Sequence, residues 1–98
     1  MKELEIAIEN EAGLHARPAS LFVQTASQFD SDIQVSNVTR ETAARDAKSA
    51  IGVMTLGVAQ GHVVRITADG EDAEQAIEAL RALIEGHFAQ AYEEDEEG

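Results

Sequence analysis

The chain has no cysteine, so a disulfide framework and thiol chemistry are both excluded. It also lacks a long apolar segment. The longest run without a charged residue, 49–64, contains three glycines and several polar residues, which makes it unsuitable as a membrane span. Acidic and apolar residues alternate within residues 1–11, a pattern unlike that of a secretory signal. We therefore expect a cytoplasmic protein, and a length of 98 residues predicts one domain.

Basic residues are scarce. The sequence has 7 lysines and arginines against 19 acidic residues, a net charge of −12, and its only lysines are Lys2 and Lys48. Such a chain repels phosphate backbones and anionic lipids, so nucleic acid and membrane surfaces are unfavourable partners. An acid-rich composition with little lysine also favours a halophilic source, in which salt screens the self-repulsion. An ordinary acidic protein is the alternative.

The acidic residues are unevenly distributed. Residues 93–97 are five consecutive acids, so we expect a folded domain over residues 1–90 and a disordered tail over 91–98. By contrast, residues 12–29 and 47–68 contain no carboxylate. If these two segments meet in space, they form a face of the molecule that does not repel an anion.

Three segments alternate between apolar and polar residues, which is typical of half-buried strands: Glu3–Glu9, Asp32–Val38 and Val63–Ala68. The segment Thr39–Ala47 is ambiguous. It is either a partner strand or, from the helical propensity of Glu41 to Asp46, a helix.

Three helices are predicted. Apolar spacing indicates one over Ala16–Gln28, and Ser49 is suited to cap a short helix that continues through Leu56 and ends at Gly57. Asp72 with Gln75 resembles a capping box for a long amphipathic helix that reaches Phe88. The resulting order β-α-β-β-α-β-α predicts an α+β two-layer sandwich with an antiparallel sheet and helices on one face.

His15 stands directly before the helix predicted to begin at Ala16. A helix N-terminus binds anions, because free amides converge there and the helix dipole is positive. Pro18 has no N–H, so Ala16 and Arg17 supply the usable amides, and the Arg17 guanidinium matches phosphate geometry. The dipole and Arg17 favour a neutral, nucleophilic imidazole. His15 is therefore either a phosphoryl acceptor or simply the residue that caps the helix.

The motif GLHARPAS at 13–20, followed by VQTAS, AKSAIGVMTLGVAQG and ITADGEDAEQAIEAL, closely resembles the HPr family. These are the histidine-containing phosphocarriers of the phosphoenolpyruvate-dependent sugar phosphotransferase system. The resemblance runs from about Glu3 to Glu85 and implies an open-faced β-sandwich of four antiparallel strands under three helices. It also implies that His15 carries a phosphoryl group on Nδ1 and that Arg17 contacts the phosphate.

The resemblance implies a relay in which enzyme I phosphorylates His15 and an enzyme IIA domain of a sugar transporter receives the group. It implies a monomer that needs no metal or cofactor, and whether such a carrier counts as an enzyme is a matter of definition. Two alternatives stay open. One is a carrier for another relay, such as dihydroxyacetone phosphorylation or nitrogen signalling, and the other is a regulatory binding module.

Further residues match the family. Ser49 matches a serine that some relatives use for regulatory phosphorylation, although capping of the short helix is the preferred explanation for a serine at this position. Ala50, Ile51 and Met54 match an apolar patch that docks partners. Ile51 is the better candidate for an exposed anchor, because Met54 also suits the core.

Two remaining features have no functional match. The segment Ser36–Asp46 is longer than in relatives and lacks their Asn-Gly turn, so we expect an irregular hairpin remote from His15. His62 and His87 are expected to be surface residues, and the spacing of the three histidines does not suggest a zinc site.

Overall fold

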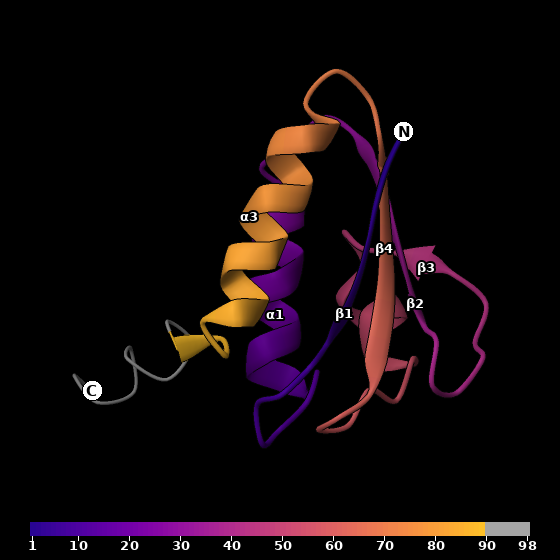
Figure 1. Ribbon diagram of the computed structural model, residues 1–98, viewed down its shortest axis with the longest axis vertical. Helices are drawn as coiled ribbons and strands as arrows, with labels where there is room; N and C mark the ends of the chain where they lie inside the picture. Colours follow the sequence, from indigo (N-terminus) through magenta and orange to yellow (C-terminus); the bar gives the residue numbers. More distant parts are fainter. Residues whose placement is uncertain (90–98) are drawn as a thin grey trace.

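The computed structural model describes residues 1–89, so the predicted acidic tail over 91–98 lies outside the described residues. Within residues 1–89, the strands are β1 (Lys2–Ala7), β2 (Asp32–Asn37), β3 (Arg45–Asp46) and β4 (Val63–Asp69), and the helices are α1 (Ala16–Ala26), α2 (Ala50–Met54) and α3 (Ala73–Glu85). The strands form one antiparallel sheet in the order β1-β4-β2-β3, and the helices lie against one of its faces (Figure 1). The predicted open-faced sandwich is confirmed.

The alternating strand patterns bury one face of the sheet. Leu4 of β1 lies opposite Ile66 of β4, and Ile66 lies opposite Val35 of β2. These three side chains are buried, and together they form a row across the sheet beneath the helices. Burial of such apolar surface stabilises the fold by roughly 25 cal/mol per Å². The other face is polar, and there Arg65 donates to the Glu5 carboxylate at 2.8 Å.

All three helices are shorter than predicted, and α3 ends at Glu85 instead of reaching Phe88. α1 ends at Ala26, and Ser27 is its C-cap. α2 ends at Met54, although its predicted cap is confirmed, since the Ser49 hydroxyl accepts from the Gly52 amide at 3.1 Å. No described helix is long and apolar enough to cross a membrane.

The predicted capping box at the start of α3 is wrong. Asp72 is the N-cap residue, but its side chain makes no capping hydrogen bond. Its carboxylate instead accepts from the backbone amides of Asp30, at 2.8 Å, and Ser31, at 3.0 Å, and from the Ser31 hydroxyl. These bonds join the α3 start to the α1–β2 connection and lower the pKa of Asp72, the Ser31 hydroxyl having the largest effect.

The ambiguous segment before α2 is mostly irregular. Only Arg45 and Asp46 pair with β2, and the loop before them contains Glu41 with a φ of 56°. Asn37 closes the base of this loop through its backbone. Its backbone amide donates to Thr42 Oγ1, and its backbone carbonyl accepts from the Thr42 amide. The segment is therefore an irregular hairpin, as predicted.

The topology brings several segment ends to one edge of the molecule. β1 ends where β4 begins, with Ala7 opposite Val63, and β2 ends alongside, with Asn37 opposite Val64. α1 starts and α3 finishes at this same edge, at the bottom of Figure 1. We call it the His15 edge, since His15 lies immediately before α1.

Candidate functional site

His15 is exposed at the N-cap position of α1. Its backbone is extended, with φ −75° and ψ −173°, and its carbonyl accepts the first helical hydrogen bond from the Ala19 amide at 2.8 Å. Its imidazole makes no capping hydrogen bond. Capping by the side chain therefore does not explain why a histidine stands here, and the ring is presented to solvent.

The first turn of α1 has the features of an anion site. The amides of Ala16 and Arg17 precede the first helical hydrogen bond, so the helix itself provides no acceptor for them. The turn contains no acidic residue, and Arg17 is exposed beside His15. Pro18 is buried and anchors the turn against the core. The positive end of the helix dipole thus lies at His15, and Arg17 adds a positive charge to the same turn.

A clamp fixes the loop that carries His15. The Asn10 side-chain amide donates to the Gly13 carbonyl at 2.8 Å, and the Leu14 amide donates to the Val58 carbonyl at 3.0 Å. Gly13 has a φ of 61°, and a Cβ there would overlap the Val58 carbonyl oxygen. The loop before α1 is therefore held directly on the segment that follows α2. Sequence reasoning missed Asn10, and only the glycine at 13 hinted at this close approach.

His15 borders a hollow of about 340 Å³ at the His15 edge. The hollow is lined by Glu11, Ala12, Leu14, His15, Met54, Gly57, Val58 and Ala59. All of these except Glu11 belong to the two segments that lack carboxylates, 12–29 and 47–68. The two segments do meet in space, and they surround the imidazole with a surface that does not repel an anion.

The predicted docking residues form an exposed patch on α2. Ile51 is 78% exposed and Met54 is 44% exposed, and Ala50 is exposed as well. Met54 is not a core residue, and it lines the hollow together with His15. The patch and the imidazole therefore belong to one continuous surface. Ser49, next to this patch, is occupied as the cap of α2.

The expectation that His62 is a simple surface residue is wrong. Its ring is partly buried, and its Nδ1 atom lies 3.1 Å from the Asn37 side-chain nitrogen and 3.2 Å from the Ala59 amide. Both neighbours are donors, so Nδ1 is the acceptor and the ring proton is on Nε2. His62 thus accepts a hydrogen bond from Ala59, which lines the hollow. His87 is exposed, as expected.

One side chain of the long loop between β2 and β3 contacts the segment that follows α2. The Arg40 guanidinium lies directly on Gly57, where a Cβ would overlap its Nη1 atom. Gly57 lines the hollow that His15 borders. No local pattern predicts this approach, because it depends on the path of an irregular loop.

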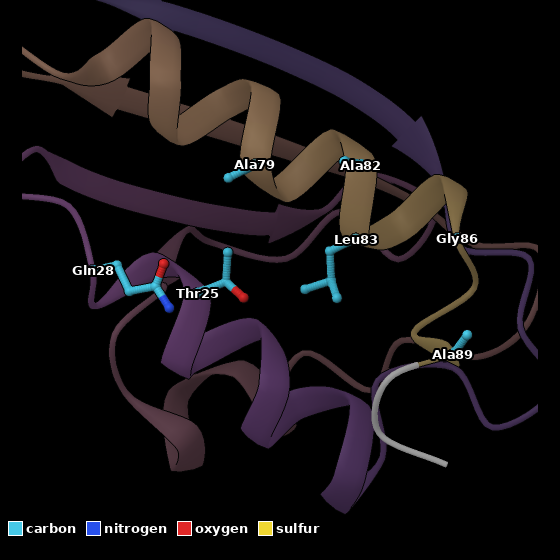
Figure 2. Close-up of a pocket in the computed structure, with 7 residues that line it drawn as sticks. All are labelled: Thr25, Gln28, Ala79, Ala82, Leu83, Gly86 and Ala89. Atoms are coloured by element: carbon cyan, nitrogen blue, oxygen red, sulfur yellow. The ribbon is translucent and has the colours of Figure 1, made fainter. Parts of the chain in front are cut away.

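A second, larger hollow lies elsewhere, between α1 and α3. It has a volume of about 460 Å³ and is lined by Thr25, Gln28, Ala79, Ala82, Leu83, Gly86 and Ala89. Figure 2 shows Thr25 on α1 and Ala79, Ala82 and Leu83 on α3, with Gln28, Gly86 and Ala89 beyond the ends of these helices. None of them titrates or acts as a nucleophile at neutral pH except weakly through the Thr25 hydroxyl. Chemistry therefore favours the smaller hollow beside His15.

Comparison with known proteins identifies a matching family model and several similar proteins. The family model described as "PTS HPr component phosphorylation site" matches residues 2–86. The phosphocarrier protein HPr of Xylella fastidiosa is 44% identical over 88 residues, which cover 90% of this chain and 96% of that protein. The multiphosphoryl transfer protein of Haemophilus influenzae is 49% identical over 77 residues, or 79% of this chain. The chain spans only 15% of that longer protein.

Solved structures agree. The crystal structure of HPr from Thermoanaerobacter tengcongensis has a TM-score of 0.86 and 54% identity, and the match covers 91% of this chain and 97% of that one. An HPr dimer from the same bacterium has a TM-score of 0.70 and 55% identity, and covers 90% of this chain and 98% of its own. Sequence, fold and the family match over residues 2–86 thus lead to one conclusion: this chain belongs to the HPr family of phosphocarrier proteins of the phosphotransferase system.

Proposed function

We propose that His15 is the phosphoryl acceptor of this carrier, that phosphorylated enzyme I is its donor and that an enzyme IIA domain is its acceptor. One observation carries the proposal: the imidazole is exposed at the N-cap of α1, makes no capping bond, and borders a hollow lined almost entirely by uncharged residues. A structural histidine at a helix start would instead use its ring as a cap.

The transfer step conserves atoms and charge without a co-reactant. A ring nitrogen of neutral His15 attacks the phosphorus of the donor's phosphohistidine, and the P–N bond of the donor breaks as the new one forms. The donor nitrogen leaves with the electron pair. The amides of Ala16 and Arg17 and the Arg17 guanidinium hold the three phosphoryl oxygens, whose charge is spread in the transition state. The reverse sequence of events delivers the group to the next carrier.

The exposed patch of Ala50, Ile51 and Met54 is the proposed docking surface for both partners. Exposed apolar side chains beside a reactive group are typical of protein contacts, and Ile51 has the largest exposed fraction of the three. Because donor and acceptor must both reach His15, they use the same surface in turn. We also infer a cytoplasmic location and a monomeric carrier, which size-exclusion chromatography with light scattering would test.

Ser49 as a regulatory site stays a prediction. Its hydroxyl accepts from the Gly52 amide, and that cap is sufficient to explain a serine at this position. A phosphate there would place up to two negative charges at the edge of the proposed docking surface.

The competing functions differ in the protein that receives the phosphoryl group from the phosphorylated chain. We would phosphorylate His15 and then add purified enzyme IIA, a dihydroxyacetone kinase subunit or a nitrogen-related IIA homologue, each alone. The proposal expects the fastest transfer to a sugar-specific enzyme IIA. Faster transfer to one of the other two acceptors would show that the chain is a carrier for that relay instead. Equal binding of partners by wild type and His15→Ala, without transfer, would favour a regulatory module.

A further inference from the structure

We propose that Arg40 is a second cationic contact for the phosphoryl-donor protein, at the rim of the hollow beside His15. The inference rests on the proposed function and adds to it a residue that determines how the donor is recognised. Its ligand is a carboxylate on the donor's surface close to the donor's phosphohistidine.

The position of Arg40 is the first argument. Its guanidinium lies against Gly57, where any side chain would overlap the Nη1 atom. Gly57 and Met54 line the hollow together with His15. Arg40, an exposed residue of the β2–β3 loop, therefore places its guanidinium against a residue that lines the hollow, whereas Arg17 belongs to the first turn of α1.

The second argument is that Arg40 is held in place by a buried side chain. The Arg40 amide donates to Asn37 Oδ1 at 3.2 Å, and Asn37 is completely buried. The same side chain donates to the Leu56 carbonyl at 3.1 Å. One amide group thus ties the loop that carries Arg40 to the segment that forms the hollow. Positioning of this kind reduces the conformational entropy lost when a partner binds.

The third argument is charge. Among residues 1–89, Arg40 forms no ion pair, whereas Arg65 pairs with Glu5 and Arg81 pairs with Glu78. A guanidinium fork matches a carboxylate in bidentate geometry. On a chain of net charge −12, a cation at the rim of the reactive hollow also guides the donor toward the productive orientation.

The test compares Arg40→Gln with Arg81→Gln. Both variants lose one positive charge, but Arg81 lies on α3 near Lys2 and Glu3, away from the hollow. Transfer from phosphorylated enzyme I to each chain would be followed over a range of carrier concentrations at low and high salt. We expect Arg40→Gln to raise KM by about 3- to 10-fold at low salt with kcat unchanged, and the difference to shrink at high salt. Arg81→Gln should behave as wild type.

Two results would overturn the inference while leaving the proposed function intact. Equal KM values for Arg40→Gln and Arg81→Gln would show that Arg40 makes no contact with the donor. A lower kcat with unchanged KM would show that Arg40 acts on the transferred group rather than on the donor's surface. Thermal midpoints for both variants check folding, and Arg40→Lys should recover the part of the effect that depends on salt. Failure of every chain, wild type included, to accept phosphate would contradict the proposed function and this inference together.

Discussion

The Cα atom of Gly13 lies so close to the carbonyl oxygen of Val58 that residue 13 has no room for a side chain. Beside it, the Leu14 amide donates to the same oxygen at 3.0 Å. This contact joins the loop before His15 to the segment after α2, so the geometry of the proposed acceptor site depends on it.

We expect Gly13→Ala to displace the His15 loop and to slow phosphorylation. The new methyl group overlaps the Val58 oxygen, and alanine is strained at a φ of 61°, so the folded state should lose about 1–3 kcal/mol. Gly61→Ala is the matched control. Gly61 also has positive φ, at 89°, but nothing lies within 4 Å of a Cβ there. Equal phosphorylation rates for the two variants would contradict the role given to the contact.

Replacement of Ile51 by serine should weaken docking without weakening the fold. The side chain is 78% exposed, so its loss should change the free energy of unfolding by no more than about 0.5 kcal/mol. Truncation of an apolar anchor typically costs about 1–2 kcal/mol of binding, or roughly 5- to 30-fold in KM for the donor. Chemical denaturation and transfer kinetics would measure the two effects. Wild-type kinetics for Ile51→Ser would remove Ile51 from the docking surface.

Asp72 should make the fold sensitive to acid. Hydrogen bonds from the Ser31 hydroxyl and from the Asp30 and Ser31 amides lower its pKa, so the unfolded chain binds the proton more readily than the folded one. The stabilisation is complete above the ordinary aspartate pKa of about 3.9 and is lost as the pH falls through the lower folded value. Asp72→Asn should therefore be less stable than wild type at neutral pH, and the difference should diminish below about pH 4.

Urea midpoints measured across this pH range test the Asp72 prediction, with Asp69→Asn as the control. Asp69 is an exposed residue at the end of β4, and its replacement removes the same charge. A constant gap between Asp72→Asn and wild type at every pH would show that the hydrogen bonds do not depend on ionisation.

Salt should stabilise the protein. Nineteen acidic residues against 7 basic ones repel each other in the compact state, and the distance over which charges interact falls from about 10 Å at 0.1 M salt to about 3 Å at 1 M. We expect the thermal midpoint to rise from low to molar salt, as the halophilic interpretation of the composition requires. A control in sucrose at matched osmolality separates the screening of charges by salt from the stabilisation that any solute excluded from the protein surface produces. Midpoints that do not change with salt would reject this interpretation.

Local patterns predicted the elements that depend on local chemistry. Alternation identified β1, β2 and β4, and the serine at 49 identified the start of α2, because a cap requires only a hydroxyl and an amide three residues on. The charge distribution also identified the two carboxylate-free segments, although only the fold shows that both line the hollow beside His15.

The errors arose where a residue bonds to a distant partner. Asp72 had a suitable neighbour at Gln75, but its carboxylate bonds to Asp30 and Ser31, which only the tertiary fold brings near. His62 was misassigned for the same reason, since its ring contacts the side chain of Asn37, which belongs to β2. The sequence pattern around each of these residues contains no trace of such contacts.

Phosphorylation by enzyme I and phosphoenolpyruvate, followed by intact-mass measurement and acid treatment, tests whether His15 is the phosphoryl acceptor. We predict one phosphoryl group per chain that is lost in acid, present in His87→Ala and absent in His15→Ala. His87 is an exposed histidine that does not line the hollow beside His15, so its variant controls for the loss of an imidazole. An acid-labile adduct that persists in His15→Ala, or no adduct on the wild-type chain with enzyme I active on another HPr, would contradict the assignment of His15 as the phosphoryl acceptor.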